Sequence, residues 1–514
     1  MTVAFSDGVN RQLKMGKTRK FFRDAVFYST SNIFANILNF ITGVMVRHIL
    51  RPAAMGLFNE ILLVFDYARY SHFGIIDSLD RELPYLYGSK NYDKVKLLRN
   101  IGFSFCIIIS VFISIVLFIA SIVLRFKGDV IFASGLYVVM CMVALQLLNS
   151  FYTVLNRAKH NFSVISINTI LVAIFDIGIK IFLTIKFGLF GLLWASVLSF
   201  GMGLVYFYRA SRQEVRFILY FPYQEIIRLL KIGFPIFIMG FIYLTLRNVD
   251  RIMIIRLLDR ESLGFYTIAL MASVYAVQVP NLIYAVIFPR FYQAYGEKQS
   301  IHKIKELFIN PTLVFAYFFP ILIGFAILAL PLLINYMLPA YKPGIAPAYL
   351  LLLGSSFLAL VNMPAYLLIA LNKQIYMVVI GVIGICLGLP LNYIFIKIFH
   401  LGITGAAVAT SITYFLYATL LMSYAFSHYT KNIFAHIKFF FQLYFPFLWV
   451  VIVLMSLRAF IASKGDNLTH DCYVVFLKGI FFILACIPLV IYVNKKTSVV
   501  SLIKKSYVRS KGNE

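Results

Sequence analysis

Charged residues are scarce in this 514-residue chain. They occupy 13% of the positions, whereas hydrophobic residues occupy 61%. A soluble domain carries about 25% charged and about 45–50% apolar residues. Because no polar stretch is long enough to form a soluble domain, the composition indicates a membrane protein along its whole length.

Cysteine is also rare, and its spacing shows no pairs. The five cysteines are Cys106, Cys141, Cys386, Cys472 and Cys486, four of them within apolar runs. This argues against a disulfide framework or a zinc site, so we expect neither a metal nor another cofactor. Gly16-Lys17-Thr18 resembles the end of a phosphate loop, but Arg11 occupies the position of the required glycine, so ATP is not implied.

Acidic residues are the scarcer of the charged residues. Asp and Glu number 20 against 47 Lys and Arg, which gives a net charge of +27. Such an excess is typical either of nucleic-acid binding or of the basic cytoplasmic loops of a membrane protein. The distribution of the charges along the chain decides between these two explanations.

Long apolar runs dominate the rest of the sequence. A membrane helix needs about 20 mostly apolar residues, and about fourteen such spans are predicted. They lie near 26–48, 57–79, 101–123, 130–155, 163–185, 188–208, 233–255, 265–288, 309–333, 347–370, 375–396, 402–426, 438–460 and 474–494. With a cytoplasmic N-terminus, most Lys and Arg residues fall on the cytoplasmic side, as the positive-inside rule predicts. We therefore expect both termini in the cytoplasm, no cleavable signal peptide and no nucleic-acid partner.

The two halves of the chain repeat each other in the same order. The run RHILR at 47–51 has a counterpart in RLLDR at 256–260. The sixth span opens with GLFG at 188–191 and the twelfth with GITG at 402–405. Such matches predict two six-helix halves in the same orientation, followed by two further helices. Parallel repeats of this kind are a transporter architecture, with the substrate site between the halves.

The expected fold class is therefore an all-α membrane protein of about 14 transmembrane helices, in two parallel six-helix repeats plus two C-terminal helices. The expected parts are a basic cytoplasmic tail at 1–25, an N-terminal six-helix lobe at 26–208, a cytoplasmic linker at 209–232, a C-terminal six-helix lobe at 233–426, two additional helices at 427–494 and a basic cytoplasmic tail at 495–514.

Two pairs of opposite charges lie within predicted spans. An ionisable side chain at membrane depth costs about 2.5–3.5 kcal/mol on insertion scales, so it needs a partner or water. Asp66 and Arg69 lie on roughly one helix face, and Asp176 and Lys180 are four residues apart. Internal ion pairing and a functional role both remain open for these residues.

The seventh span carries Arg247, Asp250 and Arg251 at helical spacing. Two cations against one carboxylate leave a positive excess, which favours a solvated cavity over a closed ion pair. Asn36 belongs to a polar stripe with Asn32 and Asn39 on the first span. This stripe suits either hydrogen bonds between helices or contact with a polar cargo.

Several sequence phrases, taken in order, resemble one known group of transporters. The phrases are Phe-Gly at 73–74 with DRELPYLYG at 80–88, Gly-Phe-Pro at 233–235, VDRI at 249–252 with LGFY at 263–266, and FPR at 288–290 with YGE at 295–297. They resemble the oligosaccharide-lipid and polysaccharide flippases of the multidrug/oligosaccharidyl-lipid/polysaccharide (MOP) exporter superfamily.

This resemblance implies a multi-pass protein of the bacterial inner membrane. Its cargo would be an undecaprenyl-pyrophosphate-linked oligosaccharide, such as an O-antigen or capsule repeat unit for lipopolysaccharide or other surface polysaccharide. It would move this cargo from the inner to the outer leaflet by alternating access. The implied partners are the lipid-linked cargo, membrane lipids, a polysaccharide polymerase and a chain-length regulator.

The candidate site follows from the chemistry of that cargo. Arginine forks match phosphate oxygens, and amides suit sugar hydroxyls. The candidate substrate-binding residues are Arg247, Arg251, Lys180, Arg69, Arg47 and Asn36. The candidate ion-coupling residues are Asp250, Asp176 and Asp66, which would use a proton or sodium gradient.

Three other functions compete with this interpretation. Multidrug exporters of the superfamily usually carry a carboxylate in the first span, and lipid II flippases carry an arginine-rich pattern early in it. Residues 26–48 contain no Asp or Glu, and their first basic residue is Arg47 near the end. Membrane glycan polymerases and glycosyltransferases place catalytic groups on long outer loops, whereas the predicted outer connections here are short. We therefore expect a transporter and no enzyme.

Overall fold

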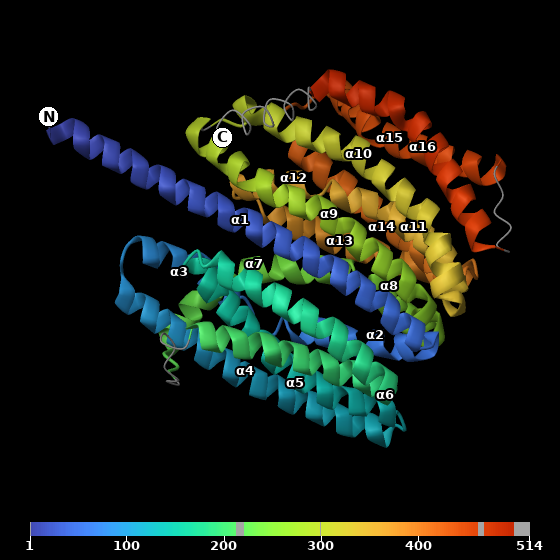
Figure 1. Ribbon diagram of the computed structural model, residues 1–514, viewed down its shortest axis with the longest axis horizontal. Helices are drawn as coiled ribbons and strands as arrows, with labels where there is room; N and C mark the ends of the chain where they lie inside the picture. Colours follow the sequence, from blue (N-terminus) through green and yellow to red (C-terminus); the bar gives the residue numbers. More distant parts are fainter. Residues whose placement is uncertain (1, 212–219, 299, 461–466, 498–514) are drawn as a thin grey trace. The chain divides into compact units, whose positions relative to one another are not determined.

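The computed structural model describes residues 2–211, 220–298, 300–460 and 467–497, and helices dominate this part of the chain (Figure 1). The α-helices are α1 (Thr2–Ile49), α2 (Pro52–Ala68), α3 (Ile75–Gly88), α4 (Tyr92–Phe126), α5 (Val130–Ala158), α6 (Phe162–Ser211), α7 (Tyr223–Leu246), α8 (Val249–Leu257), α9 (Arg260–Lys298), α10 (Lys305–Leu332), α11 (Ile345–Ala359), α12 (Asn362–Ala370), α13 (Ile375–Tyr393), α14 (Gly402–Phe426), α15 (Ile433–Phe460) and α16 (Leu468–Thr497). Four short 3₁₀ or π turns join them at His302–Ile304, Leu333–Met337, Pro339–Gly344 and Ile394–Ile398. No strand occurs among the described residues, and the predicted all-α class is confirmed.

Eleven of the described helical stretches are long and apolar enough to cross a membrane. These stretches correspond to the third to the fourteenth predicted spans. The numbers agree because α6 contains both the fifth and the sixth span. The first two predicted spans correspond to α1 and to α2 with α3. Residues 212–219 of the predicted linker and residues 498–514 of the predicted C-terminal tail lie outside the described residues.

The helix α6 shows how one long helical stretch makes two crossings. Its 50 residues would extend about 75 Å if straight, more than twice the hydrocarbon thickness of about 30 Å. Gly188 interrupts the helix with φ 57° and ψ −132°, a conformation that glycine adopts readily. A Cβ added at Gly191 would overlap with the backbone carbonyl of Leu183, so the two arms meet closely beside the turn.

The chain separates into two compact units, Met1–Phe241 and Ile242–Glu514. In the first unit α1 packs along α6, and α3 packs on both α4 and α5. Its core includes the fully buried side chains of Ile61, Leu79 and Phe151. The division predicted from the sequence, with a linker at 209–232, stays a prediction.

In the second unit α11 packs between α9 and α14, and α8 packs on α9, α13 and α14. The last two helices, α15 and α16, pack on α10. Phe308, Met422 and Phe482 are fully buried in the core that these elements share. This unit therefore contains the helices that pack around α8 and, beside α10, the two additional helices predicted at 427–494.

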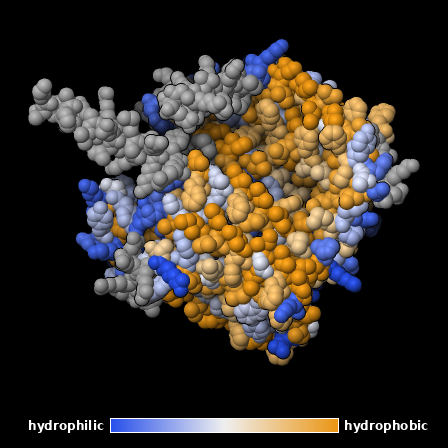
Figure 2. All heavy atoms as spheres, viewed as in Figure 1, coloured by the Kyte–Doolittle hydropathy of each residue, from blue (hydrophilic) through white to orange (hydrophobic). Residues whose placement is uncertain are grey.

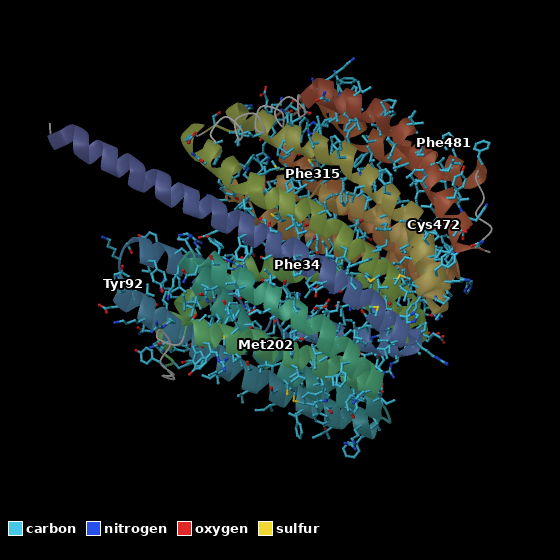
Figure 3. All side chains as sticks on the ribbon, in the orientation of Figure 1. Phe34, Tyr92, Met202, Phe315, Cys472 and Phe481 are labelled. Carbon is cyan, nitrogen blue, oxygen red and sulfur yellow. The ribbon has the colours of Figure 1, made fainter. Side chains whose placement is uncertain are left out.

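Apolar side chains also cover the exterior. Phe441 and Met455 on α15 are more than half exposed, and so is Phe476 on α16. Phe481, labelled in Figure 3, is exposed, whereas the neighbouring Phe482 is buried. Figure 2 shows hydrophobic residues over most of the face in view. Such a surface suits hydrocarbon rather than water, and the protein is a multi-pass membrane protein.

One predicted span is broken where the sequence suggested a continuous helix. The span at 57–79 ends as α2 at Ala68 and resumes as α3 at Ile75. Phe73 and Gly74 between them have φ values of 46° and 93°. The helix face that carries Asp66 therefore ends near Arg69, which still pairs with it, and does not continue into α3 as a single span would. A Cβ at Gly233 would overlap with the carbonyl of Gly74, so the break packs directly against α7.

Candidate functional site: a charged break between α7 and α8

The second broken span carries the charge cluster of the second unit. The predicted span at 233–255 forms α7, which ends at Leu246, and α8, which begins at Val249. Asn248 lies at the break with φ −115° and ψ 2°, outside the helical region. Asparagine is suited to this position because its side chain competes with the backbone for hydrogen bonds.

The side chain of Asn248 stabilises the break from one side. Its Oδ1 accepts a hydrogen bond of 2.9 Å from Nη1 of Arg251, one turn along α8. Both side chains are buried, with exposed fractions of 4% for Asn248 and 9% for Arg251. The guanidinium group of Arg251 is therefore oriented by the residue that directly precedes its own helix.

Asp250 occupies the first turn of α8 and is 1% exposed. Its Oδ2 accepts a hydrogen bond of 2.6 Å from the hydroxyl of Tyr266 on α9. Its Oδ1 accepts a second bond of 2.8 Å from the backbone N–H of Arg251. The partial positive charge at the N-terminus of a helix stabilises a carboxylate in this position.

Arg247 directly follows α7, within the break, and lies beside aromatic rings. Its Cζ is 5.8 Å from the centroid of the Tyr243 ring, within the range of a cation–π contact. It also interacts with the hydroxyl of Tyr414, a buried residue of α14. Residues of α7, α8, α9 and α14 thus converge on the break.

The cluster brings together residues that the sequence interpretation did and did not identify. Arg247, Asp250 and Arg251 were predicted, whereas Asn248, Tyr266, Tyr243 and Tyr414 were not. Tyr266 lies in the phrase LGFY that supported the resemblance, and Asn248 directly precedes VDRI. The chain has 33 tyrosines, and nothing in the sequence pattern distinguishes Tyr414 from the others.

The two pairs of opposite charges that the sequence identified lie in the first unit. Nζ of Lys180 is 2.7 Å from Oδ2 of Asp176. The other carboxylate oxygen, Oδ1, accepts a hydrogen bond of 2.6 Å from the hydroxyl of Ser199. Nη2 of Arg69 is 3.6 Å from Oδ1 of Asp66. These distances describe internal ion pairs within one helical segment each, the alternative that the sequence left open.

Two further candidates lie on α1. Nη1 of Arg47, in the last turn of this helix, donates 2.9 Å to the carbonyl of Gly43. Asn36 is half-buried in the second half of the helix. The side-chain amide of Asn32, on the same stripe, donates a hydrogen bond of 2.6 Å to the carbonyl of Tyr28. At least part of the asparagine stripe therefore hydrogen-bonds to its own helix.

A many-spanned helical fold with a charged break inside one span is the architecture of a membrane transporter. Solved structures of such transporters have a similar fold. An inward-facing multidrug resistance MATE transporter of the MOP superfamily matches with a TM-score of 0.65 and 16% identity, over 80% of this chain and 99% of that one. Lipid II flippase MurJ, in an inward closed conformation, matches with a TM-score of 0.64 and 14% identity, over 89% and 98%.

A third similar structure is a MOP superfamily transporter from Pyrococcus furiosus, with a TM-score of 0.57 and 16% identity, over 79% of this chain and 95% of that one. No curated protein matches the chain. Residues 21–295 match the family described as "Polysaccharide biosynthesis protein", and the chain belongs to this family. The predicted resemblance to flippases of the MOP superfamily is thereby confirmed.

Proposed function

We propose that this protein is a flippase for an undecaprenyl-pyrophosphate-linked oligosaccharide, which it moves from the inner to the outer leaflet of the bacterial plasma membrane by alternating access. Its family supports a role in polysaccharide biosynthesis, and its fold supports transport. The observation that carries the proposal is the positive excess of the cluster formed by the half-buried Arg247 and the buried Asp250 and Arg251.

The charge count of this cluster favours an anionic cargo. Two guanidinium groups lie near one carboxylate, and that carboxylate already accepts bonds from Tyr266 and from a backbone N–H. A net positive charge at membrane depth is costly in hydrocarbon and favourable beside an anion. A diphosphate offers charge and oxygens that match the planar fork of arginine.

The broken helix supports the same assignment. Discontinuous spans are typical of transporter binding sites, because backbone groups freed at the break can bind cargo or ions there. We place the diphosphate of the cargo at Arg247 and Arg251, with Asp250 as the residue that couples transport to a proton or sodium gradient. In this proposal the protein catalyses no covalent chemistry and works beside a polymerase and a chain-length regulator.

A multidrug exporter is the second candidate, because a MATE transporter has a similar fold. Cationic drugs would require an excess of carboxylates, whereas the cluster at the α7–α8 break has an excess of arginines. The charge sign of the cluster therefore favours the lipid-linked anion.

The test compares cells that carry the parent protein, no protein, or the double variant Arg247→Ala/Arg251→Ala at matched membrane levels. Loss of the protein should leave lipid-linked repeat units on the inner leaflet and remove the surface polysaccharide. The double variant should behave in the same way. Arg256→Ala is the matched control, since Arg256 is an exposed arginine in the last turn of the same helix. Normal surface polysaccharide in the double variant would exclude the cluster as the cargo site.

A further inference from the structure

A groove of ≈ 440 Å³ lies on the second unit, between α10, α15 and α16. Its walls are mainly aromatic and apolar, with Tyr317 from α10, Phe441 and Trp449 from α15, and Tyr492 from α16. Lys438 and Gln442 line its polar end. The groove is separate from the α7–α8 cluster in residues, and an inference about it does not depend on the proposed cargo.

Two contacts between helices fix the walls of the groove. Nε1 of Trp449 donates 2.9 Å to the carbonyl of Ala485 and so ties α15 to α16. The rings of Tyr317 and Tyr492 stack with centroids 5.6 Å apart and tie α10 to α16. The groove is therefore preformed, which lowers the entropic cost of binding a ligand.

Two lysines meet at the polar end. Lys496, in the last turn of α16, hydrogen-bonds to Oε1 of Gln442, and Lys438 lies one turn before Gln442 on α15. The two ammonium groups repel each other electrostatically. Among the described residues that line the groove none is acidic. An anion placed between the two lysines would relieve their repulsion.

The length of the groove matches one leaflet of a bilayer. Lys438 and Trp449 are separated by eleven positions on α15, which correspond to about 16 Å at 1.5 Å per residue. One leaflet contributes about half of the hydrocarbon thickness of about 30 Å. With the lysines at the interface, Trp449 lies near the middle of the membrane, and the aromatic wall between them covers the depth of one acyl chain.

We propose that this groove binds one phospholipid with an anionic headgroup. Its phosphate lies between Lys438 and Lys496, and one acyl chain lies along Phe441 and Trp449. Basic pockets between membrane helices recognise anionic headgroups in this way. The exposed flank of the groove, where Phe441 is 66% and Tyr492 45% exposed, faces hydrocarbon and admits the lipid from the bilayer.

Native mass spectrometry of the purified full-length protein tests the proposal. Delipidated protein is titrated with phosphatidylglycerol and, in parallel, with phosphatidylcholine of the same acyl chains. The parent should bind one phosphatidylglycerol more tightly than phosphatidylcholine. Lys438→Gln/Lys496→Gln should weaken phosphatidylglycerol binding by about tenfold or more, which corresponds to about 1.4 kcal/mol.

The control variant Lys431→Gln/Lys495→Gln removes two exposed lysines near the same helix ends and should bind as the parent does. Phe441→Ala changes no charge and should weaken binding of the lipid through its acyl chain. Equal binding by the two lysine variants would overturn the proposal.

Two competitors separate the anionic phospholipid from other sources of phosphate. Inorganic phosphate should not displace the bound phosphatidylglycerol, because it lacks the acyl chain. Undecaprenyl diphosphate should not displace it either, and Arg247→Ala/Arg251→Ala should retain it. Displacement by inorganic phosphate would show that the groove binds a free anion. Displacement by undecaprenyl diphosphate would show that it binds the cargo. Either result would overturn the proposal. Failure of cargo transport in the arginine variant would leave the groove assignment untouched.

Discussion

The hydroxyl of Tyr266 donates a hydrogen bond of 2.6 Å to Oδ2 of Asp250. Both side chains are almost completely buried, with exposed fractions of 0% and 1%. The bond joins α9 to the start of α8, so it holds the carboxylate in place directly beside the helix break. Asp250 is therefore positioned by a neutral phenol as well as by the charges of Arg247 and Arg251.

Removing that phenol hydroxyl should weaken the unit without changing its charge. Tyr266→Phe leaves a buried carboxylate oxygen without its donor, which costs about 1–3 kcal/mol. We expect a lower thermal unfolding temperature in detergent, and a smaller effect of Tyr266→Phe when Asp250→Asn is already present. Tyr393→Phe, at an exposed tyrosine of α13, is the control. Additive effects of the two substitutions would show that the bond contributes nothing to stability.

Arg251 should depend on the shape of its side chain as well as on its charge. Arg251→Lys keeps the charge but loses the fork that reaches Asn248 at 2.9 Å, so surface polysaccharide should fall only in part. Arg251→Ala should reduce it further. Both are measured in cells with matched membrane levels. Equal export by the lysine variant and the parent would show that charge alone suffices there.

The close approach of Gly74 and Gly233 allows a direct test of packing in the first unit. Gly74 has φ 93°, and a Cβ at either residue would overlap with the backbone of the other. Gly74→Ala and Gly233→Ala should each destabilise the protein by about 1–3 kcal/mol or more, because backbone must move. Gly178→Ala is the control, since nothing lies within 4 Å of that position. Thermal unfolding in detergent measures the difference.

The sequence predicted the helices well because each span leaves an apolar signal over about 20 residues. It did not predict the breaks at 69–74 and 247–248, because a hydropathy window averages over the few residues that change φ and ψ. The Asp176–Lys180 contact could be anticipated from i,i+4 spacing. The Tyr266–Asp250 bond could not, because it depends on how α9 packs against α8.

The predicted orientation in the membrane can be tested with single cysteines in a cysteine-free background. Lys342 and Lys90 are both exposed in the structure. The positive-inside rule places position 342 outside and position 90 in the cytoplasm. A membrane-impermeant maleimide added to intact spheroplasts should label Lys342→Cys and should label Lys90→Cys only after lysis. Labelling of position 90 from outside would invert the orientation and remove the basis for cytoplasmic termini.

Lys159 lies in the turn between α5 and α6, outside the predicted spans. Its Nζ is 5.9 Å from the centroid of the Tyr87 ring. Burial, with a smaller contribution from the positive charge of Arg99, lowers the pKa of Lys159 from 10.5 to about 8. The folded state therefore disfavours the charged amine, and the unfolded state binds more protons between about pH 8 and 10.5. Through this group, stability should rise with pH across that window.

The same shift makes Lys159 reactive near neutral pH. At pH 7 the Lys159 amine is neutral in about one molecule in ten. A lysine with the ordinary pKa of about 10.4 is neutral in fewer than about one molecule in a thousand. Competitive acylation followed by mass spectrometry should give a labelling midpoint near pH 8. Arg99→Gln should raise that midpoint only in part, because burial is the larger cause and remains. A midpoint in the parent above pH 10 would show that this amine is open to water and is not buried beside Tyr87.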